Sequence, residues 1–256
     1  MIMALVSIIL PVFNGEKTIE KAVQSIINQS FTDWEMLILD DGSTDRTAII
    51  IKNIADARIN FIPCQHQGIV ARLNQGIDLA KGKYIARMDA DDVAHSTRLE
   101  KQVRFLETHS QVDLVGTAMN LFSEEGNFMD TRVFAINHEA IIATPWLKTI
   151  SMAHPTWCGR TAWFKKWKYK TGFNRNEDQE LLLRARLSSC YANLNEVLVD
   201  YKMNNSWQKK YKARIGWLKA LWHHFGKKGN ILVFLLGTMT TLCKLLLDRI
   251  MLKIQL

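Results

Sequence analysis

The sequence predicts an α/β protein with a mostly parallel β-sheet flanked by helices, followed by a helical C-terminal extension. Short apolar runs alternate with segments of helical periodicity over the first 120 residues. Two of these runs end in clusters of Asp, and the segment after residue 201 is basic and rich in Trp. Strands separated by helices of about 10–15 residues are typical of β-α-β units, and therefore of a parallel sheet.

The order of elements follows from these patterns. Strands are predicted at Leu5–Leu10, Trp34–Leu39, Arg58–Ile62, Lys83–Met88 and Val112–Ala118. Helices are predicted between them, at Glu16–Asn28, Thr44–Ile54, Gly68–Ala80 and Thr97–Thr108. The pattern weakens over residues 123–149, which we expect to cross one face of the sheet. A helix at Leu181–Leu187 and a strand at Ala192–Val199 then follow.

The Asp clusters lie where two predicted strands end. Asp40, Asp41 and Asp45 follow one apolar run, and Asp89-Ala90-Asp91-Asp92 follows another. Ligands of parallel sheets bind beyond the carboxyl ends of the strands, and carboxylates suit a hard cation that also holds phosphate oxygens. The alternative is turn or N-cap chemistry, which is the ordinary interpretation of a single Asp such as Asp45 or Asp92.

Several classes of protein are disfavoured. Neither G-x-G-x-x-G nor G-x-x-x-x-G-K-[ST] is present, which argues against a dinucleotide oxidoreductase and a P-loop NTPase. The four Cys residues are widely spaced, so neither a zinc knuckle nor a disulfide framework is indicated, and a reduced cytosolic compartment fits. The apolar N-terminus lacks a preceding basic region and is interpreted as a first strand, not a signal peptide.

Six motifs together resemble the non-processive, bacterial envelope or polysaccharide type of family 2 glycosyltransferases, which have the GT-A fold. The motifs are V-S-I-I-L-P-V-F-N at Val6–Asn14, L-D-D-G-S-T-D at Leu39–Asp45, the segment Leu73–Asp92, H-P-T at His154–Thr156, E-D-Q-E-L-L-L-R at Glu177–Arg184, and L-N-E-V-L-V-D-Y-K-M at Leu194–Met203. The resemblance covers residues 4–203. It implies a catalytic domain over residues 1–203, with a nucleotide-sugar-binding part at 1–120 and an acceptor and catalytic-base part at 121–203.

The resemblance also assigns donor-site residues. It implies that Pro11 and Phe13 lie beside the base, that Asp41 accepts a hydrogen bond from uracil, and that Asp89 faces the ribose or sugar. The remaining implied donor-binding residues are Glu16, Arg72, Asn74 and Arg87. Asp91 is the implied ligand of a divalent metal, Mn²⁺ or Mg²⁺, which neutralises the leaving diphosphate. Core packing is the alternative role for Phe13.

Three further residues belong to the implied acceptor side. Asp178 matches the catalytic base, which takes a proton from the acceptor hydroxyl in an inverting reaction. Glu177 and His154 are implied to lie near the acceptor or the diphosphate. The alternatives are that Glu177 and Asp178 only stabilise a helix N-terminus, and that His154 is structural.

Two departures from the family pattern stand out. The family's terminal Y-R-x-H reads Tyr201-Lys202-Met203-Asn204, so the contact that its His makes is in doubt here. The Q-x-x-R-W of processive synthases is absent, which predicts transfer of a single sugar.

Residues 204–256 are predicted to form a helical, membrane-associating extension. Residues 202–256 hold eleven Lys and Arg and one acidic residue, a net charge of +10, whereas the preceding 201 residues hold 22 basic and 24 acidic residues, a net charge of −2. The uncharged stretch Ile231–Cys243 is shorter than the roughly 20 residues of a bilayer span, so we interpret it as an interfacial helix or hairpin on anionic lipid. The alternative is packing against the catalytic domain or a second copy. Nucleic-acid binding is disfavoured because no binding module accompanies the charge.

The resulting hypothesis is an inverting hexosyltransferase at the cytoplasmic face of the cell membrane, peripherally attached. It would move a sugar from a UDP-sugar to a lipid-linked or cell-envelope saccharide acceptor. Two alternatives stay open: a nucleotidyltransferase-like enzyme, and a membrane scaffold with a degenerate nucleotide site.

Overall fold

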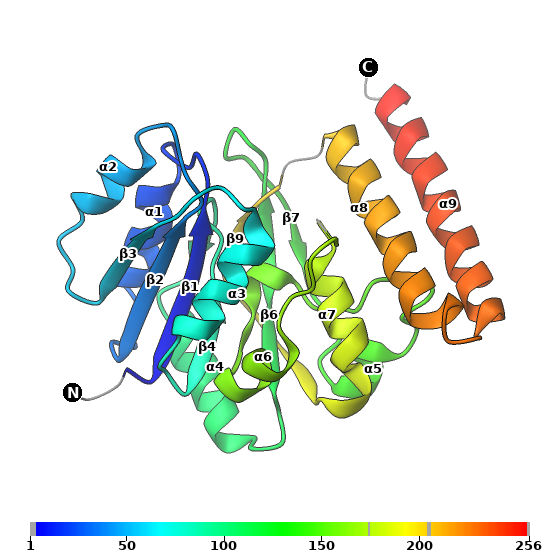
Figure 1. Ribbon diagram of the computed structural model, residues 1–256, viewed down its shortest axis with the longest axis horizontal. Coiled ribbons are helices and arrows are strands. Elements are labelled where there is room, and N and C mark those ends of the chain that lie inside the picture. The colour runs from blue at the N-terminus through cyan, green and yellow to red at the C-terminus, as the bar shows by residue number, and fades with distance from the viewer. Residues whose placement is uncertain (1–3, 174, 204–205, 255–256) are drawn as a thin grey trace.

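The structure, a computed structural model, describes residues 4–173, 175–203 and 206–254 (Figure 1). Its strands are β1 (Val6–Val12), β2 (Trp34–Asp40), β3 (Ile59–Pro63), β4 (Tyr84–Arg87), β5 (Val93–Ala94), β6 (Leu114–Phe122), β7 (Phe128–Arg132), β8 (Cys158–Arg160) and β9 (Tyr191–Lys202). Its α-helices are α1 (Ile19–Ile27), α2 (Thr47–Lys52), α3 (Ile69–Leu79), α4 (Arg98–Thr108), α5 (His138–Ile142), α6 (Thr161–Trp167), α7 (Glu177–Ala185), α8 (Trp207–Leu221) and α9 (Ile231–Ile254). Shorter helical turns are η1 (His154–Thr156), η2 (Arg186–Ser188) and η3 (Trp222–Gly226).

The sheet is mixed, with a parallel N-terminal part. Its order is β3-β2-β1-β4-β8-β6-β9-β5, and β7 pairs with β6 at the side. The strands β3, β2, β1 and β4 are mutually parallel, as predicted. Parallel pairing also joins β6 to β9, whereas β8, β7 and β5 pair antiparallel to their neighbours. The short strands β7 and β8 were not predicted, because neither forms an apolar run long enough to be distinguished from a loop.

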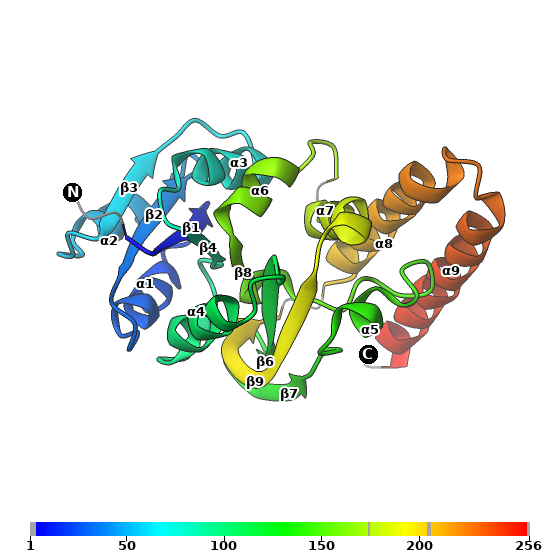
Figure 2. The ribbon, with the colours of Figure 1, turned by 90° about the horizontal axis from the view of Figure 1, so that it is seen from below.

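Helices cover both faces of the sheet (Figures 1 and 2). The alternating side chains of β1 show the two layers. Val6, Ile8 and Leu10 belong to one buried cluster, with α1 and α4, while Ile9 belongs to the other, with α3, α6 and α7. Every residue of β1 is buried, which explains why the central strands read as continuous apolar runs.

The C-terminal extension is a helical hairpin that is partly built into the protein. Trp217, Leu221 and Phe225 of α8 and η3 belong to the same buried cluster as α7. Helix α8 therefore packs against the catalytic domain, which is the alternative given above for the extension. The second helix, α9, packs on α8 and forms the outer edge of the molecule (Figures 1 and 2).

The last helix is longer than the uncharged stretch Ile231–Cys243. Helix α9 continues past Lys244 to Ile254. The Lys244 ammonium reaches back to donate a hydrogen bond to the carbonyl of Leu147 at 2.9 Å, so a long side chain leaves the helix without interrupting it. The part Ile231–Arg249 is long and apolar enough, by length and composition, to cross a bilayer.

Candidate active site

The ends of β1 and β2 lie side by side and present the first group of predicted residues. Val12 pairs with Asp40, so Phe13 and Asp41 leave the sheet next to each other. Pro11 is buried within β1, but Phe13 is 49% exposed and is therefore not a core residue. Its ring lies 4.6 Å from that of His66, centroid to centroid. This exposed pair of tilted rings offers aromatic surface at the sheet edge, of the kind on which a nucleobase stacks.

Asp41 organises the loop beside this pair. Its carboxylate accepts hydrogen bonds from the backbone N–H groups of Gln67 at 2.9 Å and Gly68 at 2.8 Å. The guanidinium of Arg72 lies 3.2 Å away and is itself buried. The Nδ1 atom of His66 lies 2.9 Å from the carboxylate oxygen Oδ2, so four nitrogen atoms surround the buried carboxylate of Asp41.

Glu16 and Asn74, the other residues expected near the donor, bind protein backbone. The Glu16 carboxylate accepts from the Arg46 N–H at 3.1 Å, which ties the β1–α1 loop to the β2–α2 loop. The Asn74 amide donates to the carbonyl of Tyr169 and accepts from its N–H, both at 2.9 Å. Asp45 accepts from the N–H of Thr47 at 3.0 Å, at the start of α2, which is the turn chemistry that a lone Asp suggests.

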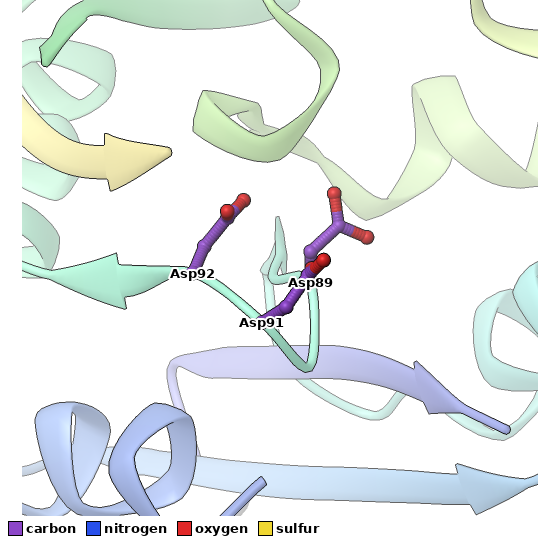
Figure 3. A group of neighbouring side chains, drawn as sticks. All are labelled: Asp89, Asp91 and Asp92. Carbon is purple, nitrogen blue, oxygen red and sulfur yellow. The ribbon is translucent and has the colours of Figure 1, made fainter. Parts of the chain in front are cut away.

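Three carboxylates crowd together between β4 and β5. One oxygen from each of Asp89, Asp91 and Asp92 lies within 4.8 Å of the others (Figure 3). Desolvation by the surrounding protein, together with the charge of Asp89, raises the pKa of Asp91 and raises that of Asp92 well above its ordinary value. Asp92 is buried, with one oxygen accepting from the N–H of Lys202 at 2.9 Å and the other lacking a partner in the part of the chain described. This donor set fits a hard divalent cation such as Mg²⁺ or Mn²⁺, which prefers carboxylate oxygen.

Two buried arginines hold this acidic turn. Arg87 forms an ion pair with Asp89, as its position inside a strand required. Burial disfavours its charge, but the adjacent Asp89 more than offsets this and the pKa of Arg87 is raised. Arg98, also fully buried, donates to the carbonyl of Arg87 at 2.7 Å. Burial lowers the pKa of Arg98 to about 10. Arg98 therefore fixes the backbone from which the acidic turn departs.

Glu177 and Asp178 open helix α7 on the opposite side of the site. Glu177 is buried, and one of its oxygens has no hydrogen-bond partner among the described residues. Burial, and then the neighbouring charge of Asp178, raise the pKa of Glu177 to about 7. Burial also raises the pKa of Asp178. The charges of Arg87 and Asp89 have smaller effects on the pKa of Glu177, which Arg87 lowers and Asp89 raises. A helix N-terminus alone would lower these pKa values, so burial dominates here.

His154 lies in the helical turn η1 and is buried. Its Nε2 is 2.7 Å from the hydroxyl of Tyr169, and its ring packs edge-on against Trp157. Burial, and then the charge of Arg87, lower the pKa of His154 well below its ordinary value. His154 is thus a neutral group that positions Tyr169, and the charges of Asp178 and Glu177 act in turn on Tyr169.

The sequence analysis did not identify His66, Asp92 or Tyr169 as site residues. His66 follows the end of β3, the third parallel strand, and that position was a usable signal. Asp92 belonged to the predicted acidic cluster but was given no role of its own, because turn formation is the ordinary role of a single Asp after a strand. Tyr169 carried no signal, since the residue that holds it, Asn74, is 95 positions away in the chain.

Comparisons with known proteins agree with this geometry. The family model described as Glycosyl transferase family 2 matches residues 7–168. The chain is 31% identical over 243 residues to the O-antigen biosynthesis glycosyltransferase WbnJ of Escherichia coli, covering 91% of this chain and 94% of WbnJ. It is 42% identical over 125 residues to the putative glycosyltransferase EpsE of Bacillus subtilis, covering 47% of this chain and 45% of EpsE. It therefore spans less than half of EpsE.

Solved structures show the same fold. S. aureus TarS (residues 1–349) in complex with UDP matches with a TM-score of 0.64 at 22% identity, covering 86% of this chain and 66% of that one. The mannosyltransferase PcManGT from Pyrobaculum calidifontis, in complex with GDP-Man and Mn²⁺, also matches with a TM-score of 0.64, at 15% identity, covering 92% and 73%. Taken with the family match, these likenesses establish that the chain has the GT-A fold and belongs to glycosyl transferase family 2.

Proposed function

We propose that this chain is a metal-dependent, inverting glycosyltransferase that transfers one sugar from a UDP-sugar to a lipid-linked or cell-envelope saccharide. One observation carries the proposal: one oxygen from each of Asp89, Asp91 and Asp92 lies within 4.8 Å of the others, just after the parallel strand β4. A divalent cation bound at Asp91 would neutralise the diphosphate as it leaves. The O-antigen function of WbnJ and the UDP bound to TarS support the acceptor and donor classes.

The chain's own residues account for the rest of the reaction. The acceptor hydroxyl oxygen forms a bond to the anomeric carbon on the face opposite the diphosphate. The bond from that carbon to the diphosphate oxygen breaks, and its electron pair goes to the diphosphate. The hydroxyl proton passes to the carboxylate of Asp178, which is the proposed base. Arg87 and Arg98 hold the acidic turn in place. Phe13, Asp41 and His66 bind the uracil ring of the donor.

The extension supports attachment to the cytoplasmic face of a membrane. Its second helix exposes a continuous apolar stripe, made up of Leu232, Leu235, Leu236, Met239, Leu242 and Leu246. Exposed apolar surface of this extent on a soluble protein marks an interaction site. The first helix, α8, carries Lys210 and Lys212, which suit anionic headgroups.

A hydrolysis screen tests the donor class. The full-length protein is incubated with individual UDP-, GDP-, CMP- and dTDP-sugars in the presence of Mn²⁺, and the released nucleotide is measured. We expect release of UDP from one UDP-sugar and its suppression by EDTA. Release from GDP-, CMP- or dTDP-sugars alone would contradict the UDP assignment. Release that is unaffected by EDTA would contradict the metal.

A further inference from the structure

A cavity beside Asp91 gathers cations from three distant parts of the chain. Its volume is about 490 Å³, and its lining includes three lysines, Lys17, Lys202 and Lys209, together with four carboxylates, Asp91, Glu16, Asp45 and Glu124. Lys17 lies just before α1, Lys202 is the last residue of β9, and Lys209 lies in the first turn of α8. The cavity thus joins the sheet edge to the C-terminal extension.

The three ammonium groups share this cavity with carboxylates, and the charge of Lys202 acts on Asp91. None of them forms an ion pair with a carboxylate in the ranges 4–173, 175–203 and 206–249, where side chains are described. By contrast, Lys83, Lys101 and Lys168 elsewhere on the surface each have a carboxylate partner. A lysine that lines a cavity without a salt bridge can contact an anionic group bound there.

Lys209 is held in place although it belongs to the extension. The Ser206 side chain caps α8 by accepting from the Lys209 N–H. Further along α8, the Asn176 amide donates to the carbonyl of Ala213 at 2.6 Å, and Trp217 is buried in the main core. The helix therefore cannot move away from the site without breaking core packing. Its N-terminus, with the positive end of the helix dipole, faces the same region as Lys209.

We propose that Lys209, together with Lys17 and Lys202, binds the phosphates of the nucleoside diphosphate next to Asp91. This inference rests on the proposed function and adds to it that the C-terminal extension is part of the donor site. As the bond between the sugar and the diphosphate breaks, negative charge grows on the departing oxygen, and a neighbouring ammonium group stabilises that charge. Transfer would then depend on α8 for chemistry as well as for attachment.

The test compares Lys209→Gln with Lys212→Gln in the full-length protein. Lys212 lies on the same helix, is exposed and does not line the cavity, so it is a matched control for loss of one charge. Binding of UDP with Mn²⁺ is measured by calorimetry, and binding of uridine, which lacks phosphates, by NMR titration. A hydrogen bond to a charged group contributes enough that its loss should weaken UDP binding by about 10- to 100-fold.

The expected pattern is specific. Lys209→Gln weakens UDP but not uridine, Lys212→Gln changes neither, and Lys209→Arg restores most of the UDP affinity. Equal UDP affinity in wild type and Lys209→Gln would overturn the assignment, as would a parallel loss of uridine binding, which would indicate a general disturbance of the fold. If the wild type binds neither UDP nor any other nucleoside diphosphate, the proposed function itself fails, and that result is recognised before any variant is compared.

Discussion

Asn176 and Gly216 are in such close contact that no side chain larger than hydrogen fits at residue 216. A Cβ built on Gly216 would lie 2.7 Å from the Asn176 amide nitrogen and 3.3 Å from its Cβ. Asn176 directly precedes Glu177 and Asp178, and its amide also donates to the carbonyl of Ala213. The start of the helix that carries the proposed base is thus packed directly on the extension. A contact between the Glu180 carboxylate of α7 and Nε2 of His224 in η3, at 3.5 Å, adds to this interface.

Gly216→Ala should therefore destabilise the protein and disturb catalysis. The added methyl group displaces Asn176, and overpacking of this kind costs about 1–3 kcal/mol. Thermal unfolding should show the loss in stability, and turnover should fall further than donor affinity because α7 shifts. Lys212→Ala, an exposed change on the same helix, is the control. Unchanged stability and turnover in Gly216→Ala would mean that α8 is not coupled to α7.

Asp178→Asn should lower turnover by about 10²- to 10⁴-fold, the usual contribution of a general base. The change preserves shape and removes proton acceptance, so UDP affinity should change little. The comparison is with Glu177→Gln, because the two carboxylates are neighbours and both have raised pKa values. If Glu177→Gln loses the rate and Asp178→Asn keeps it, the base is Glu177.

Glu177 should also make stability depend on pH. Its pKa in the folded protein is about 7, raised by burial and by Asp178, whereas in the unfolded chain it is close to 4.5. The folded state therefore holds this proton more tightly, and the resulting stabilisation is present below about pH 4.5 and is lost as pH rises through 7. Glu177→Gln keeps a neutral group at all pH values. It should be more stable than wild type at pH 8, by up to about 3 kcal/mol at 1.4 kcal/mol per pKa unit, and similar to it near pH 4.5.

Urea unfolding of the two proteins at pH 5, 6.5 and 8 measures this difference. A constant difference in the free energy of unfolding across that range would show that Glu177 is not buried in its charged form. The wild type should in addition lose activity as pH falls below 7, if the charge of Glu177 is needed beside Asp178.

The sequence predicted the site residues whose positions follow from the order of strands along the chain. Asp41 and Asp89 directly follow apolar strands, and parallel pairing of β2, β1 and β4 brings strand ends to one edge. Asp178 was identified from its motif. By contrast, the positions of Lys209 and Tyr169 depend on contacts between residues far apart in the chain, and these leave no periodic signal.

The extension shows a second kind of limit. Charge and Trp content indicated an interfacial segment, but the Trp residues lie on α8 and η3, which join the core, whereas the apolar helix α9 is largely exposed. Helix α8 contacts α7, and Gly216 allows its close approach to Asn176. A single Gly within a helical pattern does not reveal such a contact.

Asp91→Asn should abolish the dependence of UDP binding on metal. Asparagine is nearly the same size but lacks the charge that attracts a divalent cation, and Asp91 is the exposed member of the acidic turn. Calorimetry with UDP in Mn²⁺ and in EDTA should show different affinities for wild type and equal, weak affinities for the variant. Asp130→Asn, at an exposed carboxylate on β7, is the control. A metal-dependent gain in affinity that survives in Asp91→Asn would contradict the assignment of Asp91 as ligand.

The exposed stripe of α9 gives the final prediction. Leu232 and Met239 are 70% and 64% exposed, so replacing both with Ser removes apolar surface without creating a cavity. If the stripe contacts lipid, the double variant should stay folded but sediment less with vesicles containing anionic lipid, above all at high salt, where the lysines of α8 are screened. Leu187→Ser is the control, since Leu187 is 81% exposed but lies on η2, outside the extension. If the wild type ignores vesicles at every salt concentration and instead forms dimers that the double variant loses, the stripe is an interface between copies of this chain.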